Sequence, residues 1–194
     1  ILDSVHWTAS YLTATLLVYQ RWARTTDPVL RKGLAWCMGG VASMLVGQML
    51  RNGMDWIQWP PLHLLTDAFF LACGPCLTIG LVHMARPRLT PDEWRAVALD
   101  SAGFLVATLA ATLALFIPQH GDGGLLLVST LAAYPFALMA PTSLSLILLL
   151  KLRVRAQWQT LLLPLSTGAL MVLWSLWNLA SLNLSNSDGS LVNM

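Results

Sequence analysis

Apolar stretches long enough to cross a lipid bilayer recur along this sequence, and they constrain the fold more than any other feature. A helix of about 20 apolar residues spans the hydrocarbon core of a membrane. Only 10% of the residues are charged and 56% are hydrophobic, whereas about 25% are charged in an ordinary soluble domain. The sequence therefore predicts an all-α, polytopic transmembrane helix bundle that forms one integral membrane domain over residues 1–194. About six spans are expected, at residues 5–19, 34–50, 62–84, 96–117, 124–150 and 160–182.

Basic residues collect in alternate segments between these stretches, with Arg51 as the exception. The three basic segments contain Arg21, Arg24, Arg31 and Lys32; Arg86, Arg88 and Arg95; and Lys151, Arg153 and Arg155. Because Lys and Arg gather on the cytoplasmic side of a membrane protein, we expect the N-terminus outside and the basic loops in the cytoplasm. The net charge of +2 is too small and too dispersed to indicate a nucleic-acid partner.

Prolines and small residues indicate how the helices pack. Prolines inside three of the spans (Pro75, Pro135, Pro141, Pro164) each free a backbone carbonyl one turn earlier and predict kinked helices. Stripes of small residues with four-residue spacing (Ala35, Gly39, Ser43, Gly47; Gly103, Ala107, Ala111) allow close helix approach. They predict seams inside the bundle, with a homodimer or a larger membrane complex as the alternative.

Polar and aromatic residues within the spans are the candidates for binding a ligand. Asp67 and Asp100 are the acids closest to the hydrocarbon, where ionisable groups are costly, and helix-end ion pairs are the alternative explanation for both. Asp67 or His63 could anchor a polar head group near the outer surface. On the last span, Trp174, Trp177 and Asn178 share one helical face, at a depth comparable to that of Tyr134. This set predicts either a site for a lipid or small amphiphile, or plain helix packing.

Catalytic and metal chemistry has little support in the sequence. Cys73 and Cys76 have the C-x-x-C spacing of redox sites, but their apolar setting favours a structural role, and Cys37 is expected at a different depth. His6, His63 and His120 lack the spacing of metal ligands. We therefore expect no catalytic residues, no metal site and no cofactor.

The order of motifs resembles a known class of membrane regions. It comprises an aromatic and proline stretch at residues 56–61, Thr66-Asp-Ala-Phe-Phe-Leu-Ala72 followed by Pro75 and Gly80, Leu99-Asp-Ser101, and Ala133-Tyr-Pro135. This order is similar to the polytopic N-terminal sensor regions of bacterial signalling proteins whose outputs are diguanylate cyclase, cyclic-di-GMP phosphodiesterase or histidine kinase domains. The resemblance implies that Asp67, Phe69, Pro75 and Asp100 match family positions. Leu138 stands where relatives carry an acid.

The resemblance implies a sensor in the bacterial inner membrane. We expect a non-enzymatic sensory and transduction module that binds a lipid-like or amphiphilic ligand and signals to an output domain outside this chain. A structural or assembly subunit of a larger membrane complex is the first alternative. A membrane thiol redox protein that uses Cys73 and Cys76 is the second.

Overall fold

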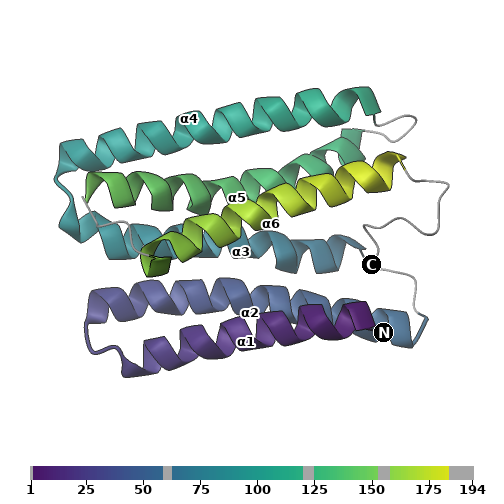
Figure 1. Ribbon diagram of the computed structural model, residues 1–194, viewed down its shortest axis with the longest axis horizontal. Helices are drawn as coiled ribbons and strands as arrows, with labels where there is room; N and C mark the ends of the chain where they lie inside the picture. The colour runs from purple at the N-terminus through teal and green to yellow at the C-terminus, as the bar shows by residue number, and fades with distance from the viewer. Residues whose placement is uncertain (1, 59–62, 120–124, 153–157, 184–194) are drawn as a thin grey trace. The chain divides into compact units, whose positions relative to one another are not determined.

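The computed structural model describes residues 2–58, 63–119, 125–152 and 158–183. These residues form helices and no strand, which confirms the predicted all-α fold (Figure 1). Five of the helices, α2 to α6, are long and apolar enough to cross a membrane, as expected of a multi-pass membrane protein. The helices are α1 (Leu2–Arg24), α2 (Pro28–Trp56), α3 (His63–Ala85), α4 (Pro91–Phe116), α5 (Leu125–Lys151) and α6 (Trp158–Asn183), with short 3-10 turns at Arg86–Arg88 and Ile117–Gln119.

The first basic segment lies mostly in helix ends rather than in a loop. Arg21 and Arg24 occupy the last turn of α1, and only residues 25–27 separate α1 from α2. Asp27 caps α2 because its carboxylate accepts hydrogen bonds from the backbone N–H groups of Val29 at 2.9 Å and Leu30 at 3.4 Å. The helices therefore extend beyond the apolar stretches that predict them.

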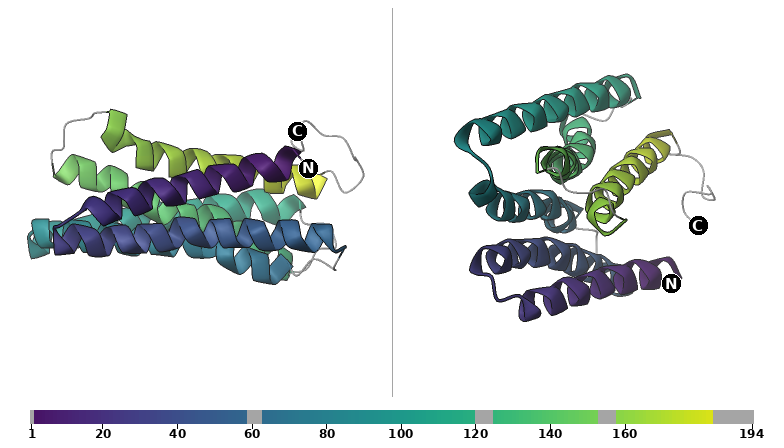
Figure 2. Two further views of the ribbon diagram at one scale, coloured as in Figure 1. Left: turned by 90° about the horizontal axis from the view of Figure 1, so that it is seen from below. Right: turned by 60° about the vertical axis from the view of Figure 1, so that its left-hand side comes forward.

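The chain divides into two compact units, residues 1–88 and 89–194. In the first unit α2 packs against both α1 and α3, and in the second α5 packs against both α4 and α6. Two further views show the same neighbours within each unit (Figure 2). Each unit is therefore a pair of helical hairpins that share their middle helix.

Glycines bring the backbones of α2 and α3 into close contact. A Cβ atom built on Gly80 of α3 would lie 2.7 Å from the carbonyl oxygen of Gly33 and 2.6 Å from the Sγ of Cys37. Farther along α2, a Cβ on Gly40 would lie 3.1 Å from the carbonyl oxygen of Cys73. At Gly80 a side chain would overlap the backbone of α2, and at Gly40 the neighbouring atoms of α3 would have to move by a few tenths of an ångström, so glycine favours this approach.

The stripe of small residues predicted on α2 is wrong, because most of its residues are not the ones buried there. The buried residues of α2 are Gly33, Cys37, Gly40, Met44, Gly47 and Gln48. From Gly33 to Gly47 they alternate steps of four and three residues, and Gln48 is adjacent to the last of them. Of the predicted stripe Ala35, Gly39, Ser43 and Gly47, only Gly47 is buried, and a Cβ on Gly39 would meet nothing within 4 Å. The stripe Gly103, Ala107, Ala111 on α4 is also exposed. It is therefore not an intramolecular seam among the described residues of its unit.

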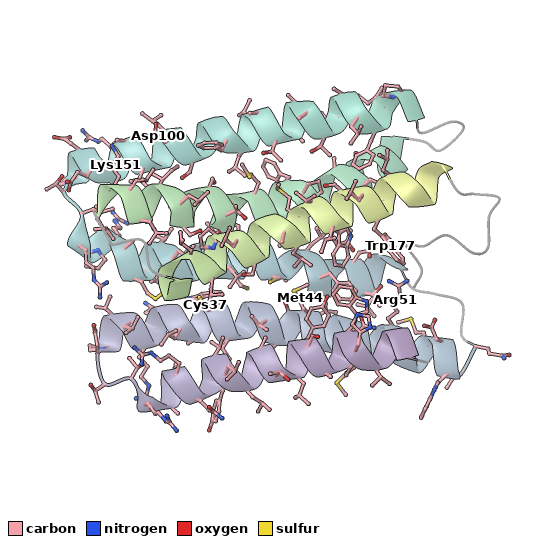
Figure 3. All side chains as sticks on the ribbon, in the orientation of Figure 1. Cys37, Met44, Arg51, Asp100, Lys151 and Trp177 are labelled. Atoms are coloured by element: carbon pink, nitrogen blue, oxygen red, sulfur yellow. The ribbon has the colours of Figure 1, made fainter. Side chains whose placement is uncertain are left out.

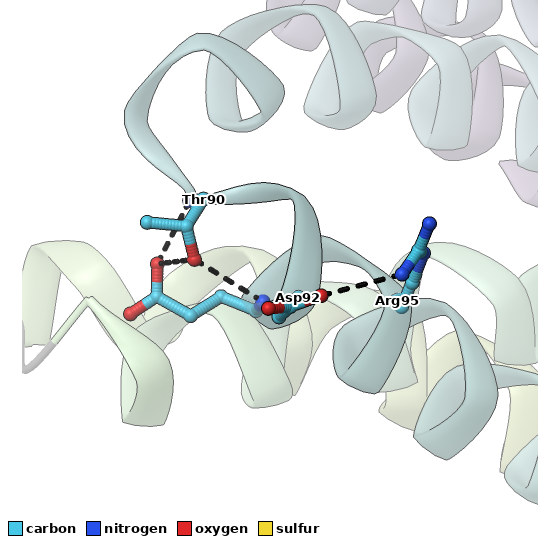
Figure 4. Close-up of polar contacts among 4 residues, drawn as sticks. Thr90, Asp92 and Arg95 are labelled. Carbon is cyan, nitrogen blue, oxygen red and sulfur yellow. Dashed lines mark hydrogen bonds and ion pairs between the residues drawn. The ribbon is translucent and has the colours of Figure 1, made fainter.

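A capping box fixes the start of α4 (Figure 4). The backbone N–H of Thr90 donates to the Glu93 carboxylate at 2.8 Å, and the backbone N–H of Glu93 donates to the Thr90 hydroxyl at 3.3 Å. Asp92 and Arg95 form an exposed ion pair at 3.3 Å in the same turn. Because these bonds satisfy the free N–H groups of the first turn, α4 begins at a defined residue.

Gly80→Ala is expected to lower the free energy of unfolding by about 1–3 kcal/mol, because the added methyl group would overlap a backbone carbonyl. The measurement is unfolding of the purified chain in mixed detergent micelles. Gly39→Ala is the matched control, since its Cβ points into open space, and we expect it to be neutral or slightly stabilising. Equal effects of the two substitutions would contradict the glycine seam.

Candidate ligand-binding site

The predicted aromatic residues meet at the interface of α5 and α6. The rings of Tyr134 and Trp174 stack with their centroids 4.6 Å apart and an angle of 15° between their planes. Tyr134 is buried and Trp174 is half-buried. Stacking of this kind adds about 0.5–1.5 kcal/mol beyond simple burial. The aromatic pair is therefore a packing contact that joins the two helices.

Asn178 satisfies a backbone carbonyl that a proline leaves free. Pro135 has no N–H group and cannot bond to the carbonyl oxygen of Leu131 four residues earlier. The side-chain Nδ2 of Asn178, on α6, donates to that oxygen at 3.3 Å. Asn178 is only 5% exposed. The amide of Asn178 thus has a structural role, whereas the sequence predicted Asn178 as a ligand-binding residue.

A buried hydroxyl pair joins the same helices closer to the end at Lys151. The Thr142 hydroxyl donates to the Thr167 hydroxyl at 2.8 Å, and Thr167 donates to the carbonyl oxygen of Leu163 at 2.8 Å. Both threonines are buried. Hydrogen bonds across membrane helices contribute about 0.6 kcal/mol on average. This pair was not among the residues predicted from the sequence, although hydroxyl residues on two proline-containing helices were a usable signal.

The other predicted ligand residues are not united with this cluster. Asp67 is half-buried in α3, His63 begins α3, and both belong to the first unit. The His63 side chain and all of His120 lie outside the described residues. Trp177, next to Asn178, is half-buried. The structure therefore brings together Tyr134 and Trp174 and places Asn178 one turn farther along α6, at the same interface with α5.

An open groove lies between α4 and α5, where the sequence predicted no ligand site. Its volume is about 560 Å³. Apolar side chains and a glycine form most of its wall, with one acid and one lysine among them. The lining residues are Leu99, Asp100, Gly103, Phe104, Ala107, Ile147, Leu150 and Lys151.

Asp100 and Lys151 lie at the same end of α4 and α5 (Figure 3). Both side chains are exposed. Among the described residues, neither is in an ion pair within 4.0 Å, whereas Asp92 and Arg95 are. The groove thus combines an apolar wall with two opposite charges, and this combination suits an amphiphile.

The first unit contains a series of side-chain hydrogen bonds that was also not predicted from the sequence. The Gln48 side-chain amide donates to Asn52 at 2.9 Å, and Asn52 donates to the Thr8 hydroxyl at 2.9 Å. Gln48 is 8% exposed. These hydrogen bonds join α1 to α2 and satisfy amide groups that would be costly to bury without partners.

The cysteines lie along the glycine seam of the first unit. Cys73 is 2% exposed, and Cys37 is buried against Gly80, one helical turn from Cys76. Because Cys37 lies opposite Gly80, its thiol is one helical turn along α3 from Cys76 and about two turns from Cys73, in line with the expected difference in depth. All three thiols are free. Their small size suits close packing, and the redox role of Cys73 and Cys76 stays a prediction.

Known proteins give no further guide to this chain. No protein-family model matches it, and no curated protein or solved structure does either. Within the described ranges, no three His, Cys, Asp or Glu side chains are grouped as metal ligands. We therefore infer the function of this chain from the geometry of its candidate sites.

Asn178→Leu is expected to lower the free energy of unfolding by about 1–3 kcal/mol, because the Leu131 carbonyl loses its donor. Pro135→Ala restores an N–H group to α5 that can bond to the same carbonyl. In the Pro135→Ala background, Asn178→Leu should therefore cost clearly less. A double-mutant cycle in mixed micelles measures this coupling. The same cost in both backgrounds would show that Asn178 does not act through the freed carbonyl.

Proposed function

We propose that this chain is a membrane-embedded sensory and transduction module that binds an amphiphile in the groove between α4 and α5. The observation that carries the proposal is the apolar groove with Asp100 and Lys151 at one end. Its volume of about 560 Å³ lies within the range of ligand pockets, about 300–1,000 Å³. Lipid-like ligands have the matching division into an apolar tail and a polar head.

The middle helix α5 is the proposed route of transduction. Ile147 and Lys151 line the groove, whereas Thr142 and Tyr134 contact α6. Pro135 and Pro141 interrupt the hydrogen-bond ladder of α5 between Ile147 and Tyr134. A ligand that contacts α5 differently in two arrangements of this kinked helix would shift their populations.

The proposal includes a location and an orientation. The clustered arginines and lysines support an orientation in which the basic helix ends face the cytoplasm, and the resemblance to bacterial sensor regions supports the inner membrane. In this orientation Lys151 lies near the cytoplasmic surface, so the groove is open to lipids of the inner leaflet. The signal would pass to an output domain or a partner that these residues do not include.

Ala107→Trp is expected to abolish retention of a bound lipid, because the indole would fill the groove. Native mass spectrometry of the purified chain, released from detergent after incubation with a total bacterial lipid extract, measures the number of lipids retained. Wild type should keep one lipid under activation conditions at which the variant keeps none. Hydrogen exchange of α5 with and without lipid should then show a change in wild type only.

Ala111→Trp is the matched control, because Ala111 is exposed on the same helix but does not line the groove. We expect it to retain lipid like wild type. Equal retention by the wild type and both variants would contradict the ligand-binding function.

A second candidate function, an assembly subunit, is favoured by the exposed stripe Gly103, Ala107, Ala111 on α4. Such a stripe suits close packing against a helix of another chain. Stoichiometric partner chains that are lost on purification of Ala111→Trp would support this alternative. An unchanged oligomeric state of that variant would count against it.

A further inference from the structure

The two charges of the groove lie on different helices at the same end. Asp100 is on α4, and Lys151 is the last residue of α5 (Figure 3). Neither is paired within 4.0 Å among the residues that the structure describes, so both can contact a ligand. Glu93 is also close enough to interact electrostatically with Lys151, but its carboxylate already accepts hydrogen bonds from Thr90.

The apolar part of the groove continues from this charged end along α4. Gly103 contributes no side chain, and a Cβ built there would meet nothing within 4 Å. Leu99 and Ala107 mark the two ends of the lining on α4, a length of about 12 Å at the rise of an α-helix. The part of an acyl chain nearest the head group fits this length beside Phe104.

The charges discriminate among lipid head groups. An anionic head group would bind Lys151 but repel Asp100, which would also lose its water. A quaternary ammonium group cannot donate hydrogen bonds, whereas a primary ammonium group donates to a carboxylate and forms the stronger, charge-assisted bond. A phosphate next to that ammonium group would lie within reach of the flexible lysine.

We propose that the groove selects zwitterionic glycerophospholipids with a primary ammonium group, such as phosphatidylethanolamine, through its ammonium at Asp100 and its phosphate at Lys151. The acyl chain lies along Gly103 and Ala107. This inference rests on the proposed amphiphile site and adds the identity of the ligand class.

The test is competition among lipids with identical acyl chains. The purified full chain is incubated with equal amounts of phosphatidylethanolamine, phosphatidylcholine and phosphatidylglycerol in detergent, and the retained lipid is identified by native mass spectrometry. We expect phosphatidylethanolamine to be enriched up to about fivefold, the most that one exposed charge pair supplies. Equal retention of the three lipids, or enrichment of phosphatidylglycerol, would overturn the inference.

Variants of the charged residues test which side chain produces the head-group preference. Asp100→Asn should abolish discrimination between phosphatidylethanolamine and phosphatidylcholine but keep lipid binding, and Asp100→Glu should restore discrimination. Lys151→Gln should weaken binding of all three phospholipids. Asp92→Asn is the control, because Asp92 is an exposed acid of the same helix outside the groove, and we expect no change. Discrimination that survives Asp100→Asn would overturn the head-group assignment.

The outcomes separate this inference from the proposed function. Equal binding of the three lipids that Ala107→Trp still abolishes would leave the amphiphile site intact and reject only the head-group selectivity. Lipid retention that Ala107→Trp does not alter would reject the site itself.

Discussion

Lipid tails are as apolar as leucine, so the hydrophobic effect does not press one membrane helix against another. The contacts that hold each unit together must therefore come from close backbone approach and from polar groups that lack partners in lipid. In the first unit, Gly33, Gly40 and Gly80 provide the close approach. In the second, Asn178 and the pair Thr142 and Thr167 satisfy polar groups across α5 and α6. The remaining side chains pack around these few points.

The length and composition of the apolar stretches were enough to predict the helices, because a helix satisfies every internal backbone group and lipid offers no alternative partner. The stripe of small residues on α2 could not be predicted in the same way. A step of four residues advances about 40° beyond a full turn, so a strict four-residue stripe moves around the helix. Alternating steps of four and three residues stay close to one line. The buried residues from Gly33 to Gly47 follow that alternation.

The contacts between α5 and α6 depend on which residues of the two helices face one another, and the sequence alone does not provide this information. Pro135 identifies Leu131 as a freed carbonyl, and Asn178 is recognisable as an amide within a span, but the two residues are 47 positions apart. Only the antiparallel register of α5 and α6 connects them. The same holds for Asp100, which was predicted as an unusual acid, and Lys151, which was predicted only as a topological charge. Their common groove depends on the register of α4 and α5.

Because α5 is the middle helix of its unit, it takes part both in the groove with α4 and in the contacts with α6. Its end at Lys151 lines the groove with α4, and its earlier turns hold Tyr134 and Thr142 against α6. Pro141 and Pro135 lie between the groove and the farthest of these contacts, where the missing N–H groups lower the resistance of the helix to bending. In the proposed function, a ligand beside Ile147 therefore acts on the helix that joins the other two helices of its unit. Because the hydrogen bonds of Asn178 and Thr142 depend on direction, a small rotation of α5 would strain them, and in the proposed function this dependence would couple occupancy of the groove to the position of α6.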